Sequence, residues 1–418
     1  MSPVRSSLGA RLGEVLEHRY FVPLCLLTGL VLRLAWMFLL PALPASDFKW
    51  YFDRAAGIVH GLGYVDNGYP TATRPVGYAA FLGLAFLLPG SPLITAKLLG
   101  VMLQGCAMLL TYQVARAVLE SRRAAAAAML IVACYPNQIA YTAILASENL
   151  FLPLLLLGSL LMIQGLRGDR ALRVVAGGVV FGAAALVRQQ AIILPVLLLL
   201  VFLREARPVR RKAVLAVAAL LAMAVVIAPW TARNLRTFPG LTLVAHNAGY
   251  NFLYYNGDQA EIQTVLHSTM DEYHKDHLAM QLGLAHVRRH PVEFVLRAPA
   301  RFWGCYSYDY EGIRWTVVCL ERASATVLRL FNPLKALAQL AYLALWLAFA
   351  GGLIRSATRP RPRYFFLGLV MLAYFVGINT VFGGGPRLHF QDIPWMALYA
   401  GAFIDWTLPA PRRATCVS

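Results

Sequence analysis

The sequence predicts an all-α protein that crosses a membrane about ten times. Of its 418 residues, 59% are hydrophobic and only 14% are charged, whereas soluble globular chains carry roughly 25% charged residues. Apolar stretches also recur at the length of about 20 residues that a transmembrane helix requires. The expected spans are residues 21–41, 92–118, 124–141, 149–166, 172–188, 190–204, 212–232, 331–355, 364–382 and 389–408.

The basic residues predict how these spans are oriented. The net charge is +18, but residues 233–329 carry ten of the 38 basic and nine of the 20 acidic residues. The excess therefore lies mainly in short loops, which is typical of the cytoplasmic side of a membrane protein and makes nucleic-acid binding a poor interpretation. Six clusters are expected on that side: Arg5/Arg11/Arg19, Arg116/Arg122/Arg123, Arg167/Arg170/Arg173, Arg204/Arg207/Arg210/Arg211/Lys212, Arg355/Arg359/Arg361/Arg363 and Arg412/Arg413.

The apolar stretch 75–89 is not counted as a span, because the six clusters share one side only if it does not cross. It is short, begins at Arg74-Pro75 and is followed by Gly90-Ser91-Pro92. We therefore expect a re-entrant or interfacial helix on the outer side, where protein or water covers it. A second interfacial helix is expected over 48–61, where aromatic residues stand beside charged ones.

This topology divides the chain into parts on two sides of the membrane. Richness in Ala, Leu and Arg suggests a GC-rich bacterium, so the expected location is the inner membrane with the outer parts in the periplasm. The predicted parts are a cytoplasmic N-terminus (1–20), an N-terminal transmembrane catalytic module (21–232) with its first outer loop at 42–91, a periplasmic segment (233–330) able to form a small subdomain, C-terminal transmembrane helices (331–408) and a cytoplasmic tail (409–418).

Two acidic residues at the outer ends of spans are candidates for chemistry. Asp47 follows the first span, and Glu148 lies where the third span ends and the fourth begins. Ionisable groups at the membrane boundary cost free energy, so they suggest a functional site. The structural alternative is a helix cap: Ser147 can cap the fourth span, and an acid in its first turn suits the helix dipole. Asp47 could likewise cap a loop.

A series of motifs runs in order over nearly the whole chain. It begins with the outward Asp47, an aromatic-rich helix from Trp50, and Gly63-Tyr64. The motifs resemble those of polyprenyl-phosphate-dependent glycosyltransferases with the GT-C fold, which include protein O-mannosyltransferases and the lipid A aminoarabinose transferase. The later motifs are Arg74-Pro75-Val76-Gly77-Tyr78, Tyr135-Pro136-Asn137, Ser147-Glu148-Asn149, Leu186-Val187-Arg188, Pro229-Trp230-Thr231-Ala232-Arg233-Asn234, Asn247-Ala248-Gly249-Tyr250-Asn251 and Gly385-Pro386-Arg387-Leu388-His389-Phe390.

The resemblance implies a GT-C-like helical bundle and a reaction at its outer face. A monosaccharide would pass from a polyprenyl-phosphate donor to an acceptor hydroxyl, with inversion at the anomeric carbon. Asp47 matches the acid of the family's first outer loop, and Glu148 matches its second carboxylate. Many members carry another acid directly after the first, where this chain has Phe48. Any metal or acceptor contact made by that acid is therefore open here.

The chemistry of such a transfer agrees with these residue types. A carboxylate can take the proton of the acceptor hydroxyl, a role we assign to Asp47 with Glu148 assisting. Guanidinium groups bind phosphate oxygens and can stabilise the departing phosphate. The phosphate candidates are Arg74, Arg188, Arg233 and Arg387, and the candidate substrate contacts are Tyr51, Tyr78, Asn149, Asn247 and His389. For Arg233 and Arg387 there is an alternative to phosphate binding: each stands near the end of a span, and its side chain could extend along the helix to the membrane interface.

Histidines could indicate a metal site in the outer segment. No CxxC or HExxH motif accompanies them, so we favour a structural interpretation, while a divalent metal ion as cofactor stays open. The residues concerned are His267, His274 and His277 with Asp271, and His286 with His290.

Cysteines and aromatic residues of the same segment also allow two interpretations. Cys305 and Cys319 lie where an oxidising compartment would permit a disulfide, but sequence does not report the geometry that a disulfide requires. A group of aromatic residues could stack on sugars, although a membrane-facing belt and core is favoured. This group is Trp303, Tyr306, Tyr308, Tyr310 and Trp315.

The expected partners are a polyprenyl-phosphate sugar donor, membrane lipids, and an acceptor that is a lipid-linked saccharide, another glycan or a protein. Two other functions remain open. A lipid or glycolipid transporter of similar helix count would often show inverted repeats and broken helices at midplane, and no repeat is visible. An O-antigen ligase or polymerase also uses lipid-linked sugars. The pair Asp47 and Glu148 favours the glycosyltransferase.

Overall fold

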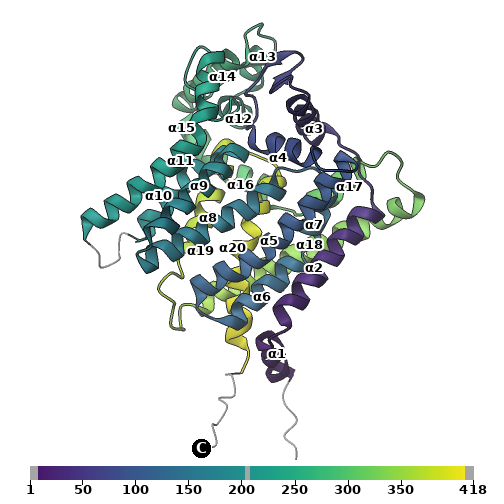
Figure 1. Ribbon diagram of the computed structural model, residues 1–418, viewed down its shortest axis with the longest axis vertical. Coiled ribbons are helices and arrows are strands. Elements are labelled where there is room, and N and C mark those ends of the chain that lie inside the picture. Colours follow the sequence, from purple (N-terminus) through teal and green to yellow (C-terminus); the bar gives the residue numbers. More distant parts are fainter. Residues whose placement is uncertain (1–7, 203–207, 410–418) are drawn as a thin grey trace, which may run out of the picture.

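The computed structural model describes residues 8–202 and 208–409, and it confirms an all-α architecture with a single two-stranded hairpin in these ranges (Figure 1). The elements are α1 (Leu8–Glu17), α2 (Phe21–Leu39), α3 (Ser46–Val59), β1 (Val65–Asp66), β2 (Tyr69–Pro70), α4 (Gly77–Phe86), α5 (Pro92–Leu119), α6 (Arg122–Ala133), α7 (Pro136–Ala140), η1 (Tyr141–Ala143), α8 (Glu148–Gly168), α9 (Ala171–Val187), η2 (Gln189–Ile193), α10 (Leu194–Val201), α11 (Val209–Thr237), α12 (Ala248–Asn256), α13 (Gln259–Leu266), α14 (Glu272–Arg289), α15 (Pro291–Leu296), α16 (Ala298–Tyr306), α17 (Glu311–Val318), α18 (Ala325–Arg355), α19 (Leu367–Phe382), η4 (Pro386–Asp392) and α20 (Ile393–Thr407).

Helices occupy all ten of the predicted spans, although their lengths differ. Within the described residues, five are long and apolar enough to cross a membrane, and a sixth span would form if α6 and the α7–η1 segment, bent by 51°, are taken together. The remaining predicted spans coincide with shorter helices, namely α9, η2–α10, α19 and α20. The protein is thus a multi-pass membrane protein, and the count of ten crossings stays a prediction. The five long helices are α2, α5, α8, α11 and α18.

The basic loops lie along the lower left side of the bundle in Figure 1, from the start of α11 at the left edge to α1 and the end of α20 at the bottom. Polar contacts join the loops there: Arg123 to Glu17 at 3.0 Å, Arg167 to Glu120 at 2.9 Å, Arg211 to Asp169 at 3.0 Å, and Arg355 to the carbonyl of Trp406 at 3.0 Å. The grouping agrees with the positive-inside pattern. Five residues of the predicted clusters lie outside the described part of the chain: Arg5, Arg204, Arg207, Arg412 and Arg413.

The stretch 75–89 forms α4, a helix of ten residues. At 1.5 Å per residue it is about 15 Å long, half the thickness of a hydrocarbon core. It packs on α3, α5 and α9. A Cβ atom at Gly77 would come within 2.7 Å of the Leu186 backbone, so glycine is required for the close approach of α4 to α9. This packing supports the expectation that 75–89 does not cross.

The first outer loop contains the expected helix, α3, followed by a hairpin that was not predicted. Phe48, Tyr51 and Ala55 form the buried face of α3. Asn67 and Gly68 both have positive φ at the tip of the hairpin, as a two-residue type I′ turn requires. Arg54 on α3 then holds Asp66 of β1 at 2.6 Å.

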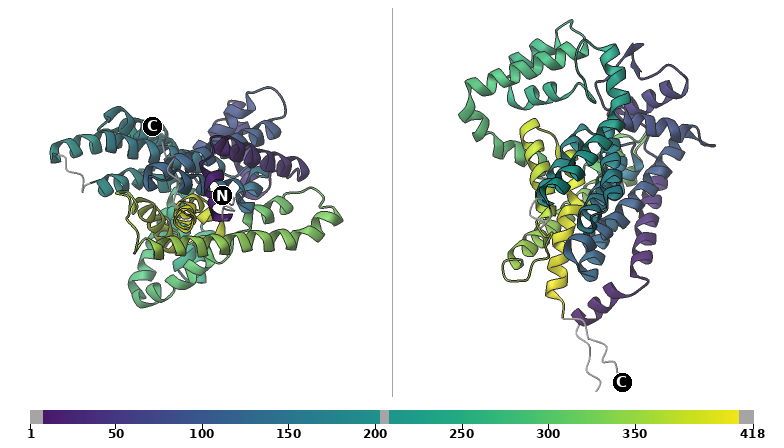
Figure 2. Two further views of the ribbon diagram at one scale, coloured as in Figure 1. Left: turned by 90° about the horizontal axis from the view of Figure 1, so that it is seen from below. Right: turned by 60° about the vertical axis from the view of Figure 1, so that its left-hand side comes forward.

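The second outer segment divides into two layers. Helices α12, α13 and α14 pack around a small core of Leu253, Ile262, Val265 and Ala279, and Figure 2 shows this group at the end of the molecule opposite α1. Helix α16 instead packs on α19 and η4, and α17 on α7 and α18. The outer subdomain is therefore α12–α14, while α16 and α17 join the bundle.

The disulfide between Cys305 and Cys319 that the sequence left open is not formed, because both cysteines are free. Cys305 is the penultimate residue of α16, and its thiol donates to the carbonyl of Gly384 at 2.9 Å. Cys319 follows α17, and its carbonyl accepts a hydrogen bond from the Leu43 backbone at 2.6 Å. The two helices pack on different parts of the bundle, which holds the thiols in separate surroundings.

The predicted aromatic group is divided in the same way. Trp303 is 70% exposed, whereas Tyr306 is buried against η4 and donates to Asp392 at 2.7 Å. Tyr308 and Tyr310 stack on each other with ring centroids 4.4 Å apart. The group therefore does not form one continuous platform.

Candidate functional site

A cleft of about 1070 Å³ lies between the bundle and the outer subdomain. One wall comes from the ends of bundle segments, namely α3, the loop before α4, η2 and η4. The opposite wall comes from α12, α14 and the loop before α12. Six of the predicted site residues line it: Tyr51 and Asn247, and the four charged residues Asp47, Arg74, Arg188 and Arg387.

These four charged residues and Glu148 form one continuous chain of ion pairs. Arg74 Nη2 lies 2.6 Å from Asp47 Oδ1, and Arg387 Nη1 lies 3.1 Å from Asp47 Oδ2. The same Arg387 side chain reaches Glu148, with Nε 2.5 Å from Oε1 and Nη2 3.0 Å from Oε2. Arg188 Nη1 lies 2.9 Å from Glu148 Oε1. Three guanidinium groups thus face two carboxylates, which leaves a net charge of +1.

The two carboxylates differ sharply in exposure. The Glu148 side chain is completely buried, and both its oxygens are paired with arginine. The Asp47 side chain is 40% exposed and faces the cleft. A buried carboxylate is tolerated only when it is paired and hydrogen-bonded, so the arginines account for the burial of Glu148. Asp47 is the carboxylate of this pair that a substrate can reach.

Local structure explains how each charged residue reaches the site. Asp47 stands in the first turn of α3 and Glu148 is the first residue of α8, positions where the helix dipole favours an acid. Arg188 follows α9 with extended backbone. Arg387 lies in η4 behind Gly383 and Gly384, both of which have positive φ.

A broken helix places Glu148. The chain bends by 51° between α6 and the α7–η1 segment, which begins at Pro136. Asn149 then holds the connection from η1 to α8, because its amide donates to the carbonyls of Tyr141 at 2.9 Å and Ile144 at 3.2 Å. Asn149 is buried and is not among the residues that line the cleft. Its contacts are structural, and as the next residue in the chain it helps to fix the position of Glu148.

Two of the arginines make cation–π contacts with aromatic rings. Arg74 lies over the ring of Trp50 at 4.9 Å and over that of Tyr51 at 5.7 Å, and Arg387 lies over Phe48 at 5.0 Å. Such contacts favour the cation by about 0.5–2 kcal/mol. Burial lowers the pKa of Arg387, but the Glu148 carboxylate more than offsets this, and the pKa is raised above its usual value.

The tyrosines and Asn247 occupy different depths. Tyr51 lines the cleft, and Tyr78 lies behind it in an edge-to-face contact at 5.2 Å. Burial raises the pKa of both phenols, so they stay neutral. Asn247 lines the cleft and accepts a hydrogen bond from Gln189 Nε2 at 2.7 Å.

Arg233 and His389 are not brought into the cleft. Arg233 donates to the carbonyls of Thr71 at 3.0 Å and Tyr64 at 3.1 Å, so it ties α11 to the first outer loop. His389 is buried, with Nδ1 2.6 Å from the carbonyl of Cys305 and Nε2 3.3 Å from Asp309. Neither is among the lining residues.

Several lining residues were not predicted. Gln189 and Gln190 directly follow Arg188 and interrupt an otherwise apolar stretch, a signal that the sequence did contain. The opposite wall carries Tyr273, Asp276 and His277 on α14. Nothing in the sequence links α14 to Asp47, because the two are joined only by the packing of the outer subdomain.

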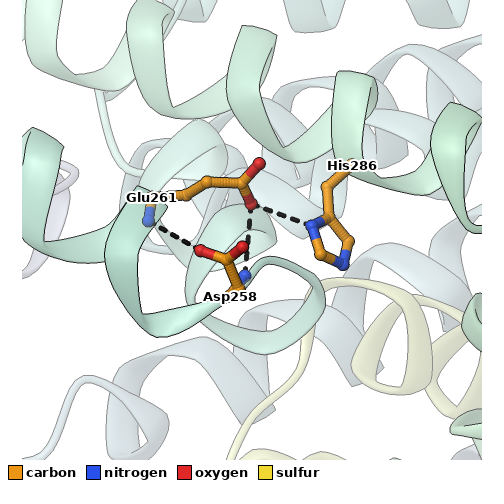
Figure 3. Close-up of side chains that lie close together, drawn as sticks. All are labelled: Asp258, Glu261 and His286. Carbon is orange, nitrogen blue, oxygen red and sulfur yellow. Dashed lines mark hydrogen bonds and ion pairs between the residues drawn. The ribbon is translucent and has the colours of Figure 1, made fainter.

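Candidate metal ligands lie elsewhere. Asp258, Glu261 and His286 bring their ligand atoms within 4.8 Å of one another (Figure 3). Asp258 and Glu261 form a capping box at the start of α13, and Glu261 also pairs with His286 at 2.9 Å and with Arg289 at 3.0 Å. Both oxygens of Glu261 thus already have partners, Oε2 in His286 and Oε1 in Arg289. Of the histidines considered from sequence, only His286 belongs to this group.

Comparison with known proteins was made on sequence and on fold. Residues 73–231 match the family model described as dolichyl-phosphate-mannose-protein mannosyltransferase, a stretch that includes Arg74, Glu148 and Arg188. No curated protein sequence matches the chain.

Among solved structures, the chain is similar to the apo oligosaccharyltransferase of Archaeoglobus fulgidus, with a TM-score of 0.57 and 13% identity over 92% of this chain and 50% of that one. It therefore spans about half the length of that protein. It is also similar to ArnT from Cupriavidus metallidurans bound to undecaprenyl phosphate, with a TM-score of 0.44 and 16% identity over 94% of this chain and 77% of that one. The apo state of that ArnT gives a TM-score of 0.41 and 16% identity over 92% and 75% of the two chains.

The helical bundle and its charged outer cleft define a polytopic membrane protein with a polar site at one end. The family match and the likeness to the oligosaccharyltransferase identify the fold as GT-C, the fold of membrane glycosyltransferases. The fold expected from the sequence motifs is thereby confirmed.

Proposed function

We propose that this protein transfers a monosaccharide from a polyprenyl-phosphate donor to an acceptor hydroxyl, with inversion, at the cleft that opens on the periplasmic side. One observation carries the proposal: the accessible Asp47 carboxylate is flanked by Arg74 and Arg387, at 2.6 and 3.1 Å, in a cleft of about 1070 Å³. The site therefore combines a proton acceptor with cations that suit a phosphate. The family match to a dolichyl-phosphate-mannose transferase supports the class of donor.

The walls of the cleft suggest how the donor lies. Ile192 and Ile193 of η2 and Ile378 and Phe382 of α19 provide apolar surface, which suits the isoprenoid chain near its phosphate. The arginines lie beside this surface. Arg74 lines the cleft and its side chain is 29% exposed, so its guanidinium can meet a phosphate oxygen while Nη2 keeps its contact to Asp47.

The reaction divides between the two carboxylates. Asp47 takes the proton of the acceptor hydroxyl as its oxygen attacks the anomeric carbon. The bond from that carbon to the phosphate oxygen breaks, and its electron pair leaves with the phosphate. Arg74 and Arg387 stabilise the charge that develops there. Attack from the face opposite the leaving phosphate inverts the anomeric carbon.

Glu148 was expected to assist Asp47, and its contacts suggest how it does so. It is buried and paired with Arg188 and Arg387, so we infer that it positions these two arginines while Asp47 takes the proton. The charges that it neutralises would otherwise repel each other across the site.

Release of polyprenyl phosphate from a radiolabelled polyprenyl-phosphate sugar tests the proposal. Purified full-length protein should release it in the presence of an acceptor extract, and Asp47→Asn should reduce the rate by about 10²–10⁴-fold, as expected for loss of a general base. Asp53→Asn, an exposed aspartate of the same helix, is the matched control. Equal release by the wild type and Asp47→Asn would contradict the mechanism, and movement of an intact donor across a bilayer would indicate a transporter.

A further inference from the structure

A carboxylate of the outer subdomain holds the loop that carries Arg74. Glu272, the first residue of α14, accepts hydrogen bonds from the Thr71 hydroxyl at 2.7 Å and the Thr73 hydroxyl at 2.7 Å. It also accepts one from the backbone N–H of Ala72 at 2.5 Å. Three consecutive residues, about 200 positions away in sequence, thus depend on one side chain.

The same three-residue turn, 71–73, is fixed from two other directions. The backbone N–H of His246 donates to the carbonyl of Ala72 at 2.8 Å. Arg233 donates to the carbonyl of Thr71 at 3.0 Å. Thr71 and Ala72 are buried, so the turn has no solvent to replace these partners. Loss of a buried hydrogen-bond partner costs about 1–3 kcal/mol.

Arg74 follows this turn directly. Its carbonyl accepts a hydrogen bond from the Tyr64 hydroxyl at 3.0 Å, and Pro75 comes next. The backbone of Arg74 is therefore held on both sides, and the turn sets where its guanidinium lies relative to Asp47. The Arg74 guanidinium is the group that the proposed function assigns to the phosphate.

Helix α14 also forms part of the cleft wall. Tyr273, Asp276 and His277 line the cleft one, four and five residues after Glu272. Any group that displaces this helix must also act on the 71–73 turn, because Glu272 is part of the helix. The wall that faces the substrate and the arginine that faces the phosphate are thus joined by one carboxylate.

We propose that Glu272 is a positioning residue, which fixes the 71–73 turn so that Arg74 reaches both Asp47 and the donor phosphate, and which ties that arginine to the cleft wall of α14. The inference rests on the proposed function, since it assigns the phosphate contact to Arg74. Glu272 would then belong to the site although it touches no substrate atom, because it acts through Arg74.

Steady-state release of polyprenyl phosphate by four proteins tests this role: the wild type, Glu272→Ala, Arg74→Ala and the double variant. We expect Glu272→Ala to lower kcat at least tenfold, because misplacement of a charged group by about 1 Å can cost 10²-fold in rate. In the Arg74→Ala background the same change should cost less than twofold, since a residue that acts through Arg74 has nothing left to position.

Three further variants keep the result interpretable. Glu272→Gln should retain a substantial part of the rate, because an amide can still accept from Ala72 and donate to the two hydroxyls. Thr71→Val with Thr73→Val should resemble Glu272→Ala. Glu261→Ala is the matched control, because Glu261 also accepts several hydrogen bonds in the outer subdomain but lies away from the cleft.

The possible failures are distinguishable. If the wild type releases no polyprenyl phosphate, the proposed function fails and this inference falls with it. If the wild type is active, two results would overturn this inference alone. One is a Glu272→Ala variant with the kcat of the wild type. The other is a fall in kcat on Glu272→Ala that is as large in the Arg74→Ala background as in the wild type. An equal loss in Glu261→Ala would also overturn it, because the effect would then be a general weakening of the subdomain.

Discussion

Arg387 and Glu148 form a bidentate ion pair in the interior of the protein, with Nε 2.5 Å from Oε1 and Nη2 3.0 Å from Oε2. The third contact of the same guanidinium, 3.1 Å to Asp47, leads to the surface of the cleft. One arginine thus joins a carboxylate that is fully buried to one that a substrate can reach. Bidentate geometry of this kind fixes direction as well as distance, so the position of Arg387 is set by Glu148.

This pair predicts a separation of stability from activity. Arg387→Gln should lower the midpoint of thermal unfolding, because breaking a buried ion pair costs about 3–5 kcal/mol. Adding both Glu148→Gln and Arg188→Gln should restore most of the midpoint, since Glu148 and Arg188 also pair with each other and neither is then left as a buried charge without a partner. Activity should stay at least tenfold below the wild type in both variants, because the phosphate has lost a cation. A triple variant no more stable than Arg387→Gln would contradict this account.

A second prediction concerns divalent metal ions. The guanidinium of Arg387 already occupies the space between Asp47 and Glu148, so a cation bound by both carboxylates would have to displace it. We expect polyprenyl phosphate release to continue at an unchanged rate after treatment with EDTA. A loss of activity that Mg²⁺ or Mn²⁺ restores would show that Arg387 moves aside for a metal.

A third prediction concerns pH and His246, which is packed against Glu272 and Tyr273. Burial lowers the pKa of His246 from its ordinary 6.5. Below that pH the unfolded chain binds a proton that the folded chain does not, so the free energy of unfolding falls as the pH is lowered through about 6.5. His246→Gln should therefore lose less stability between pH 7.5 and 5.5 than the wild type. His60→Gln, at an exposed position, should behave as the wild type in the same thermal scans.

A fourth prediction concerns the free thiols. Burial raises the pKa of Cys305 to about 11, and its thiol is bonded to the carbonyl of Gly384. The native protein should therefore leave Cys305 unlabelled by a maleimide at pH 7, while denaturation without reductant should expose both Cys305 and Cys319. Peptide mass analysis distinguishes them. A requirement for reductant before labelling would indicate the disulfide that the structure lacks.

The sequence predicted the helices, and the charged residues that it offered as site candidates lie together in the structure. Asp47 and Glu148 were selected because charged groups at the membrane boundary are costly, and Arg74, Arg188 and Arg387 because guanidinium groups bind phosphate. The structure places all five in one chain of contacts. Asp47 and Arg387 are separated by 340 positions along the chain. Which charges would meet could not be predicted from spacing, because it depends on how α3, α8, α9 and η4 pack.

The same limit applies to candidates that the structure places away from the site or apart from each other. Arg233 has the residue type of a phosphate ligand, but it lies against loop carbonyls. Cys305 and Cys319 share a segment, but their helices pack on different neighbours. Glu272 carries no motif at all, and its importance arises only from the turn at 71–73.

The sequence by itself determined that this chain spans a membrane and that its polar candidates lie at the ends of the spans. Both follow from local stretches of sequence, namely the length of each apolar run and the free-energy cost of a charge within it. The tertiary structure alone decided that Asp47 faces the cleft while Glu148 is buried beneath two arginines. That difference depends on contacts between helices far apart in the chain. It assigns the two carboxylates their separate proposed roles.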